Sequence, residues 1–261
     1  MRQERLYRTE ALILKRSDFG EADRLLTVYT PSAGKLRLLA KGVRKPTSRK
    51  AGHLELFTHS RLLVARGRSL DIITQAETIE TFRPLRQTLW RAACAYYTAE
   101  LLDSFSAENE ENRLLFDLLL VTLKRLSRES RLKLVLRFYE LRLLELVGYR
   151  PQLFRCLKCG AQIEPVENFF SPAEGGVLCP RCGEDTPVAR RLPLNVLKVL
   201  RFIQTYDYPT CRRLRLSKPL HDELERTLQG YIVYLLERKL KSVAFIKRLR
   251  RELSGEAALE A

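Results

Sequence analysis

The sequence predicts an α+β protein, in which a small β-barrel is followed by a helical domain that carries an inserted module. Three observations support this prediction. The first 80 residues contain short runs of β-branched and aliphatic residues bounded by turn residues. From Arg83 onward the apolar residues recur with helical periodicity. Between about 150 and 190 this periodicity stops, and two closely spaced cysteine pairs occur among Pro and Gly residues.

Five strands are expected before Arg83. Their ranges are 9–16, 24–30, 35–42, 54–66 and 70–79. Pro31 and Gly34 predict a tight hairpin between the second and third strands, and the "GRS" segment at 67–69 predicts another between the fourth and fifth. An antiparallel unit of this length suits a small closed barrel such as an OB-fold, and an SH3-like barrel fits the same pattern. We therefore expect a barrel domain over residues 1–82.

Helices are expected in the remainder of the chain. Their ranges are 83–105, 112–126, 127–148, 193–204 and 218–240. Gly148 is suited to end the third helix, and Ser217 is suited to cap the start of the fifth. These segments predict an all-α domain over residues 83–250, interrupted by the module at about 150–190. The tail at 251–261 is expected to be disordered.

The charge of the chain indicates the class of its partners. The 261 residues include 47 Lys and Arg against 31 Asp and Glu, which gives a formal net charge of +16. A field of this sign favours polyanions, and nucleic acid is the leading class. A highly charged surface kept for solubility is the simpler alternative. The charged N-terminus and the lack of a long uncharged apolar run predict a soluble, cytoplasmic protein without a membrane segment.

The paired cysteines predict a metal site. "CLKCG" at 156–160 and "CPRCG" at 179–183 have the spacing of a structural zinc module. Four thiolates complete a tetrahedral site and leave no open position for chemistry, so the ion is expected to fold the module. A pair of redox dithiols or an iron–sulfur cluster would be the alternative. The expected ligands are Cys156, Cys159, Cys179 and Cys182. Cys94 stands apart from them in an apolar stretch and is expected in the core.

A basic surface is expected on the third strand and in the loop that follows it. Alternation along the strand would turn Leu36 and Leu38 inward and the cations outward. The expected phosphate-binding residues are Lys35, Arg37, Lys41, Arg44, Lys45, Arg49 and Lys50, with no acid among them. Such contacts would add affinity without base specificity. A solvated loop is the simpler interpretation, and the second cationic stretch at 238–251 allows a helix-end role as readily as DNA contact.

No catalytic constellation is evident in the sequence. A phosphate-binding P-loop, a dinucleotide-binding glycine motif and a hydrolase nucleophile motif are all missing. Asp18, Glu21 and Asp23 precede the second strand and would suit Mg²⁺ in a metal-dependent nuclease. We favour a turn with solvated carboxylates at this position. The chain is therefore predicted not to be an enzyme.

Three stretches of the sequence resemble the bacterial RecO family of DNA repair and recombination mediators. They are "TEALILKRSDFGEADRLLTVYTPSAGKLRLLAKGVRKPTSR", "FYELRLLELVGYRPQLFRC" and the paired "CLKCG" and "CPRCG", in matching order over nearly the whole chain. The resemblance implies an N-terminal OB-fold, a helical C-terminal domain with a zinc module, and no nucleotide hydrolysis. It also implies that the family's zinc ligands correspond to the four cysteines and its basic surface to the seven cations named above.

The resemblance further implies a function in recombinational repair of gaps. Family members bind single- and double-stranded DNA, anneal complementary strands, associate with RecR and engage the acidic C-terminal tail of single-stranded DNA-binding protein (SSB). With RecR they help RecA load onto SSB-coated single strands, in the cytoplasm and at the nucleoid. An RNA-binding or ribosome-associated zinc-ribbon protein would share the charge and the four-cysteine module, and it is the alternative from a different class.

Overall fold

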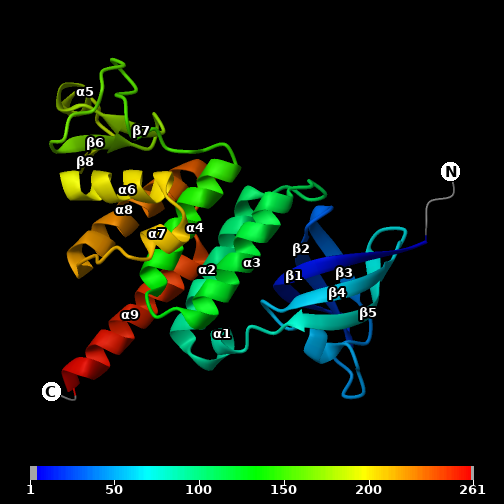
Figure 1. The fold of residues 1–261 in the computed structure, drawn as a ribbon. Coiled ribbons are helices and arrows are strands. Elements are labelled where there is room, and N and C mark those ends of the chain that lie inside the picture. Colours follow the sequence, from blue (N-terminus) through cyan, green and yellow to red (C-terminus); the bar gives the residue numbers. More distant parts are fainter. Residues whose placement is uncertain (1–4, 260–261) are drawn as a thin grey trace. The chain divides into compact units, whose positions relative to one another are not determined.

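A computed structural model describes residues 5–259 of the chain, and residues 5–252 with their side chains. The described residues form two compact units. Unit 1 comprises the residues up to Ser130 together with those from Lys241 onward, and unit 2 comprises Arg131–Leu240. Figure 1 shows the strands of unit 1 in blue to cyan.

Unit 1 contains a closed five-stranded barrel. Its strands are β1 (Leu6–Phe19), β2 (Asp23–Thr30), β3 (Gly34–Ala40), β4 (His59–Ala65) and β5 (Asp71–Glu80). The order around the barrel is β1-β2-β3-β5-β4, and β4 closes onto β1. All neighbouring pairs are antiparallel except β3 and β5, which run parallel. The expected α+β class, with a five-stranded OB-fold barrel followed by helices, is confirmed.

The barrel forms because inward positions on each strand are apolar and outward positions are polar. Its core includes Ile13, Leu26, Val28, Leu38 and Val64, all at most 1 % exposed. On β3, Leu38 lies in this core and Arg37 is exposed, as the predicted alternation requires.

The fourth strand begins later than predicted. A strand was expected from 54, but Ala51–Leu54 forms a short 3-10 helix (η1), and Phe57 adopts a positive φ of 65°. A residue in this left-handed conformation interrupts an extended strand. The strand β4 therefore starts only at His59.

Gly34 is required at the β2–β3 turn. Its φ is +60°, and a Cβ built at this position would lie 1.7 Å from the carbonyl oxygen of Glu110. The turn is also held by Thr30, whose hydroxyl donates to the carbonyl of Gly34 at 3.0 Å and accepts from the amide of Ala33 at 3.2 Å. Both the backbone conformation and the close approach of residue 110 exclude a side chain here.

Four helices of unit 1 accompany the barrel. They are α1 (Pro84–Gln87), α2 (Leu89–Phe105), α3 (Arg113–Arg128) and α9 (Lys241–Leu259). The single helix expected over 83–105 is divided because Thr88 is extended and caps α2 by accepting from the amide of Arg91. Asn112 caps α3 in the same way.

These helices make contacts with the barrel and belong to the same compact unit, whereas the sequence predicted a domain boundary after residue 82. The ammonium of Lys35 on β3 donates to the carbonyl oxygen of Asp103 in α2 at 2.7 Å. The amide of Asn109 donates to the carbonyl of Lys35 at 2.9 Å. The rings of His59 and Phe116 meet edge to face, with centroids 5.7 Å apart.

The helix α9 was not expected, and it occupies most of the tail predicted to be disordered. The carboxylate of Glu100 in α2 accepts from the amides of Lys241 and Ser242, at 2.9 and 2.8 Å, and so satisfies the first turn of α9. Residues 260–261 of the expected tail lie outside the described residues.

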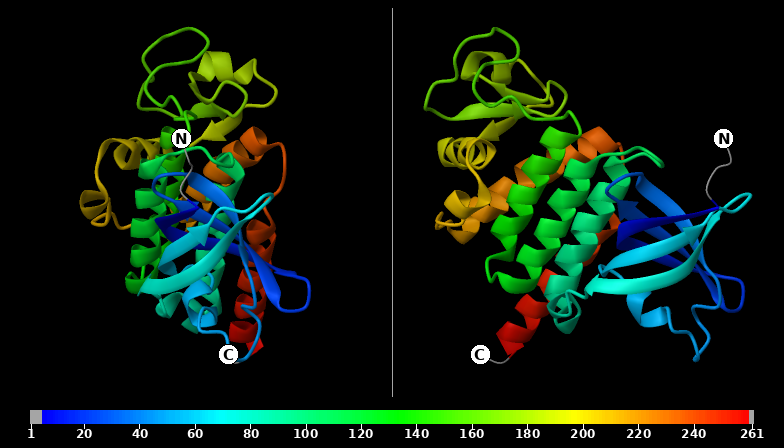
Figure 2. Two further views of the ribbon diagram at one scale, coloured as in Figure 1. Left: turned by 90° about the vertical axis from the view of Figure 1, so that its right-hand side faces the viewer. Right: turned by 45° about the vertical axis from the view of Figure 1, so that its right-hand side comes forward.

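Unit 2 combines helices with a small three-stranded sheet. The helices are α4 (Leu132–Leu146), α5 (Pro180–Glu184), α6 (Leu194–Thr205), α7 (Tyr208–Cys211) and α8 (Lys218–Leu236). The strands are β6 (Asn168–Ser171), β7 (Gly176–Leu178) and β8 (Arg190–Leu192), in the order β7-β6-β8. Two further views are given in Figure 2.

A buried group of charges joins two helices of unit 2. Arg137 of α4 donates to Glu140 at 2.7 Å and lies 3.8 Å from Glu225 of α8. The side chains of all three are at most 9 % exposed. Removing one member would leave a buried charge without its counterion, which is more costly than losing an exposed pair.

Among the described residues, every helix is too short or too polar to cross a lipid bilayer.

The first prediction concerns Gly34. We expect Gly34→Ala to destabilise the chain by about 2–4 kcal/mol, because it adds a left-handed alanine and a clash with a backbone oxygen. Gly52→Ala is the matched control, since Gly52 has an ordinary φ and nothing within 4 Å of an added Cβ. Thermal and urea unfolding should separate the two variants. Equal stability of both would show that the turn is not constrained as described.

Candidate nucleic-acid interface and metal centre

The loop after β3, residues 41–50, follows a defined path. Its first turn closes with the amide of Lys45 donating to the carbonyl of Gly42 at 3.2 Å. Two hydrogen bonds join it to the β1–β2 turn: the amide of Gly42 donates to the carboxylate of Asp23 at 2.7 Å, and the amide of Arg44 donates to the carbonyl of Ala22 at 2.9 Å. The loop and the β1–β2 hairpin therefore form one surface.

Four of the seven predicted phosphate-binding residues are exposed on this loop. They are Lys41, Arg44, Lys45 and Arg49. Arg44 lies 3.5 Å from Asp18, and its guanidinium also donates to the carbonyl of Gly20 at 3.3 Å. The ion pair is exposed, so it weakens the local positive field only in part.

The other three predicted residues are engaged within unit 1. The side chain of Lys35 is 11 % exposed, and its ammonium lies 3.1 Å from the carboxylate of Asp103. Lys50 is half-buried and donates to the carbonyl of Ile73 at 2.8 Å, and burial lowers its pKa. Arg37 remains half-exposed, 4.0 Å from Glu108. The alternation that predicted an outward Lys35 could not show that a helix would cover it.

The strand register adds a cation that sequence analysis missed. Lys15 on β1 pairs with Thr27 on β2, which in turn pairs with Arg37 on β3. Residues paired across strands lie on the same face, so Lys15 and Arg37 flank Thr27 about 10 Å apart. The signal was hidden because the register of β1 shifts between Ile13 and Lys15. The positive surface therefore extends from the loop across three strands.

The acidic residues before β2 have structural partners. Asp18 lies 3.2 Å from the guanidinium of Arg24 as well as close to Arg44. Asp23 accepts the amide of Gly42. Among the described residues, metal-ligating side chains converge at the four cysteines and not at this acidic group. The carboxylates of Asp18 and Asp23 therefore hold the loop against the hairpin.

The four predicted ligands converge at one point of unit 2. The Sγ atoms of Cys156, Cys159, Cys179 and Cys182 all lie within 4.8 Å of one another, and those of Cys159 and Cys179 are 3.8 Å apart. Four sulfurs at about 2.3 Å from a tetrahedral ion would lie about 3.8 Å from one another. The cluster therefore has the dimensions of a four-thiolate metal site.

Two glycines shape the cysteine loops for different reasons. Gly160 has a φ of +73° and donates its amide to the carbonyl of Cys156 at 2.8 Å, a left-handed turn that favours glycine. Gly183 lies in α5 without a positive φ. A Cβ there would lie 2.3 Å from the ring of Phe169, so this glycine is needed for close packing and not for a left-handed turn.

The thiols have shifted pKa values. Burial raises the pKa of Cys156, but donation from the backbone amides of Cys159, Cys179 and Lys158 outweighs it and brings the pKa to about 6. The pKa of Cys182 is raised to about 12, first by its hydrogen bond to Cys179 and further by the other sulfurs. Crowded sulfurs resist a second negative charge, and a bound divalent cation would remove that resistance.

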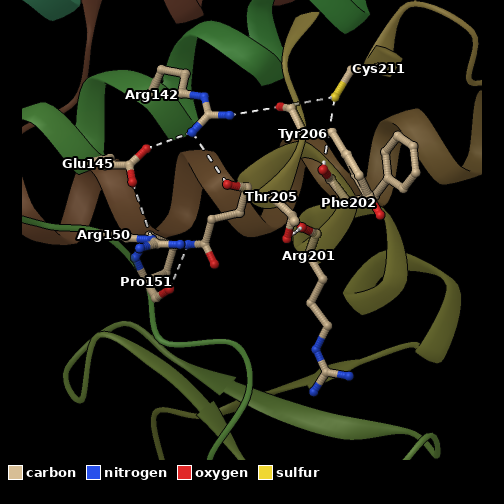
Figure 3. Close-up of polar contacts among 10 residues, drawn as sticks. Arg142, Glu145, Arg150, Pro151, Arg201, Phe202, Thr205, Tyr206 and Cys211 are labelled. Atoms are coloured by element: carbon tan, nitrogen blue, oxygen red, sulfur yellow. Dashed lines mark hydrogen bonds and ion pairs between the residues drawn. The ribbon is translucent and has the colours of Figure 1, made fainter.

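A polar network holds the segment that leads into the cysteine module (Figure 3). Arg142 of α4 donates to the carboxylate of Glu145 and to the carbonyl of Tyr206, both at 2.8 Å. Glu145 in turn lies 3.5 Å from the guanidinium of Arg150. The end of α4 is thereby joined to the end of α6 and to the start of the connecting segment.

Side chains of α6 hold the same segment from the other side. Gln204 is 5 % exposed and donates to the carbonyl of Pro151 at 2.9 Å. Arg201 donates to the carbonyl of Leu153 at 2.8 Å, and its guanidinium lies 5.0 Å from the ring centre of Phe154. These bonds satisfy carbonyls that no strand pairs, and they fix the position from which Cys156 enters the cluster.

The two remaining cysteines are buried and lie outside the cluster. Cys94 and Cys211 are both fully buried. The thiol of Cys211 lies 3.6 Å from the carbonyl of Tyr206, as Figure 3 shows. The position of Cys94 agrees with the core role that its sequence context predicted.

Comparison with known proteins assigns the chain to a family. The family models "Recombination protein O N terminal" and "Recombination protein O C terminal" match residues 1–82 and 86–244. The DNA repair protein RecO of Roseiflexus sp. (strain RS-1) is 45 % identical over 251 residues, which is 96 % of this chain and 88 % of the relative. That of Dehalococcoides mccartyi (strain ATCC BAA-2266 / KCTC 15142 / 195) is 38 % identical over 94 % of this chain and 96 % of its own. The chain therefore belongs to the RecO family of DNA repair and recombination proteins.

Proposed function

We propose that this protein binds single- and double-stranded DNA and anneals complementary strands during the recombinational repair of gaps. The observation that carries the proposal is the continuous positive surface formed by the 41–50 loop and the outer face of β1, β2 and β3. Cations that neutralise the phosphates of two strands reduce the repulsion between them, and base pairing then drives annealing. No nucleotide hydrolysis enters this mechanism.

The seven predicted residues differ in exposure, and we expect them to contribute to DNA binding in different ways. Lys41, Lys45 and Arg49 are exposed and carry most of the direct phosphate contact, with Arg44 beside them. Arg37 contributes from the strand face. Lys35 and Lys50 are held by unit 1 itself and contribute through the field rather than through contact. The contacts are to the backbone of DNA, so binding is independent of sequence.

The proposed partners follow from membership of the family. With RecR, the protein would help RecA load onto single strands coated by SSB, and it would engage the acidic C-terminal tail of SSB. The net charge of +16 suits both an acidic peptide and DNA.

We further propose that the metal at the four cysteines is zinc and that it is structural. Four thiolates saturate a tetrahedral ion, so no position remains for water or substrate. The segment between the two cysteine pairs has only the short strands β6 and β7 as regular structure, and it gains most from a bound ion.

The DNA proposal predicts the effect of reversing the exposed loop charges. The triple variant Lys41→Glu, Lys45→Glu, Arg49→Glu should bind single-stranded DNA at least 100-fold more weakly. Each lost contact should reduce the slope of log affinity against log salt by about 0.7, so the slope should fall by about 2. Fluorescence anisotropy across a salt series measures both quantities, and strand annealing without ATP should slow in parallel.

The matched control for this variant is Arg213→Glu, Arg215→Glu, Lys218→Glu. These three cations are exposed on unit 2, and their reversal changes the net charge by the same amount. Its affinity and salt slope should stay much closer to those of the parent. Equal loss in both variants would mean that net charge, and not the loop, determines binding.

The zinc proposal predicts one zinc ion per chain and a local effect of its loss. Cys156→Ser should lose the ion and make residues 150–190 sensitive to protease, while the barrel stays folded. Cys211→Ser removes a buried cysteine outside the cluster and should keep its zinc. Elemental analysis and limited proteolysis followed by mass spectrometry give the two readouts. Full metal content in Cys156→Ser would contradict the assignment.

A further inference from the structure

Phe19 is an exposed aromatic residue at the end of β1. Its side chain is 48 % exposed, whereas Tyr29, Phe57 and Phe82 of the same unit are at most 2 % exposed. An exposed apolar residue is ordinary by itself. The position of Phe19 is what gives it meaning, because it lies at the β1–β2 turn to which the cationic loop is bonded.

The strand register places Phe19 on the outer, cationic face of the barrel. Phe19 pairs with Asp23 on β2, and alternation along β1 puts Lys15 on the same face, four residues and about 13 Å away. The strand β3 lies on the other side of β2, and Arg24 of β2 pairs with Ala40 of β3. The next residues along these antiparallel strands, Asp23 and Lys41, therefore lie next to each other at the strand ends. Phe19 thus shares its face with two exposed cations, Lys15 farther along β1 and Lys41 at the end of β3, with Asp23 of β2 between Phe19 and Lys41.

The hairpin that carries Phe19 is held in place. The guanidinium of Arg44 donates to the carbonyl of Gly20 at 3.3 Å, and the amide of Arg44 donates to the carbonyl of Ala22 at 2.9 Å. Asp18 is bonded to Arg24 across the hairpin at 3.2 Å. The ring therefore projects from a fixed support, and little ordering of the backbone would oppose a ligand that stacks on it.

We propose that Phe19 is a stacking platform for a nucleobase of single-stranded DNA, with Lys15 and Lys41 binding the flanking phosphates. The inference rests on the proposed DNA-binding function and adds a basis for preferring single strands. An aromatic face accepts every base, which suits binding without sequence preference. OB-folds bind oligonucleotides with the face of strands 2 and 3 and with the loop between strands 1 and 2, where Phe19 lies.

A base in a DNA duplex cannot make the same stacking contact with Phe19. In double-stranded DNA each base is stacked between its neighbours, and the protein meets the phosphate backbone first. Phe19 therefore contributes to single-strand affinity and leaves duplex affinity to the cations. During annealing the ring would release its base as the duplex forms, so that the product is held less tightly than the separate strands.

The test separates stacking from charge. Phe19→Ala should weaken binding of an oligo-dT strand by between about 5-fold and 150-fold, the range measured for loss of one stacked base. Its salt slope and its affinity for duplex should be those of the parent, because no cation is removed. Phe19→Tyr should retain the affinity. Leu6→Ala is the matched control, since Leu6 is also 48 % exposed and lies at the opposite end of β1.

A direct probe uses the single tryptophan of the chain. Placing Phe19→Trp in a Trp90→Phe background makes residue 19 the sole tryptophan. Oligo-dT should quench its fluorescence, and duplex should not. If dT leaves the fluorescence unchanged and Phe19→Ala binds like the parent while the triple loop variant is weakened, the stacking inference is wrong and the proposed function stands. If the parent binds neither strand form, both are overturned.

Discussion

The carboxylate of Asp23 accepts the amide of Gly42 at 2.7 Å, and the arrangement of the basic surface depends on this bond. It joins the loop after β3 to the β1–β2 hairpin, and the amide of Arg44 strengthens the junction through Ala22. Without it, only the bonds of Arg44 would hold the loop against the hairpin, and mutual repulsion would spread the loop cations apart. With it, the loop, the hairpin and the outer face of three strands present one surface to a phosphate backbone, at little cost of ordering on binding.

The features that depend on a local sequence pattern could be predicted. Alternation predicted the inward face of β3, and the repeated spacing of Cys156 and Cys159 with Cys179 and Cys182 predicted a cluster, whose sulfur atoms lie within 4.8 Å of one another in the structure. Prediction was incomplete where a residue's contacts come from an element that is distant in the sequence. Lys35 points outward from β3, but its ammonium forms an ion pair with Asp103 of α2. Lys15 joins the surface only because β1 changes register beside it. Glu100, which caps α9, is 141 residues away from Lys241 in sequence.

The two units use their polar groups in different ways. In unit 1 the loop cations Lys41, Lys45 and Arg49 are exposed to solvent, so each gives little to stability and remains available to an anion. In unit 2 several polar groups are buried and bonded within the fold. Arg137 is buried with Glu140 and Glu225, and Gln204 donates a hydrogen bond to a carbonyl of the segment that leads to Cys156. The proposed four-thiolate metal site would belong to this second class, because a bound ion would organise a short module and leave no coordination position for a reaction.

We infer that the hairpin and the loop together form the surface that holds DNA. Photo-crosslinking of the full chain to single strands with bromodeoxyuridine at successive positions, followed by peptide mapping, is a direct test. Crosslinks are expected in peptides that contain residues 15–24 and 41–50, and they should be lost in high salt and competed by unmodified single strands. Crosslinks confined to residues 131–240, with none in these two segments, would contradict it.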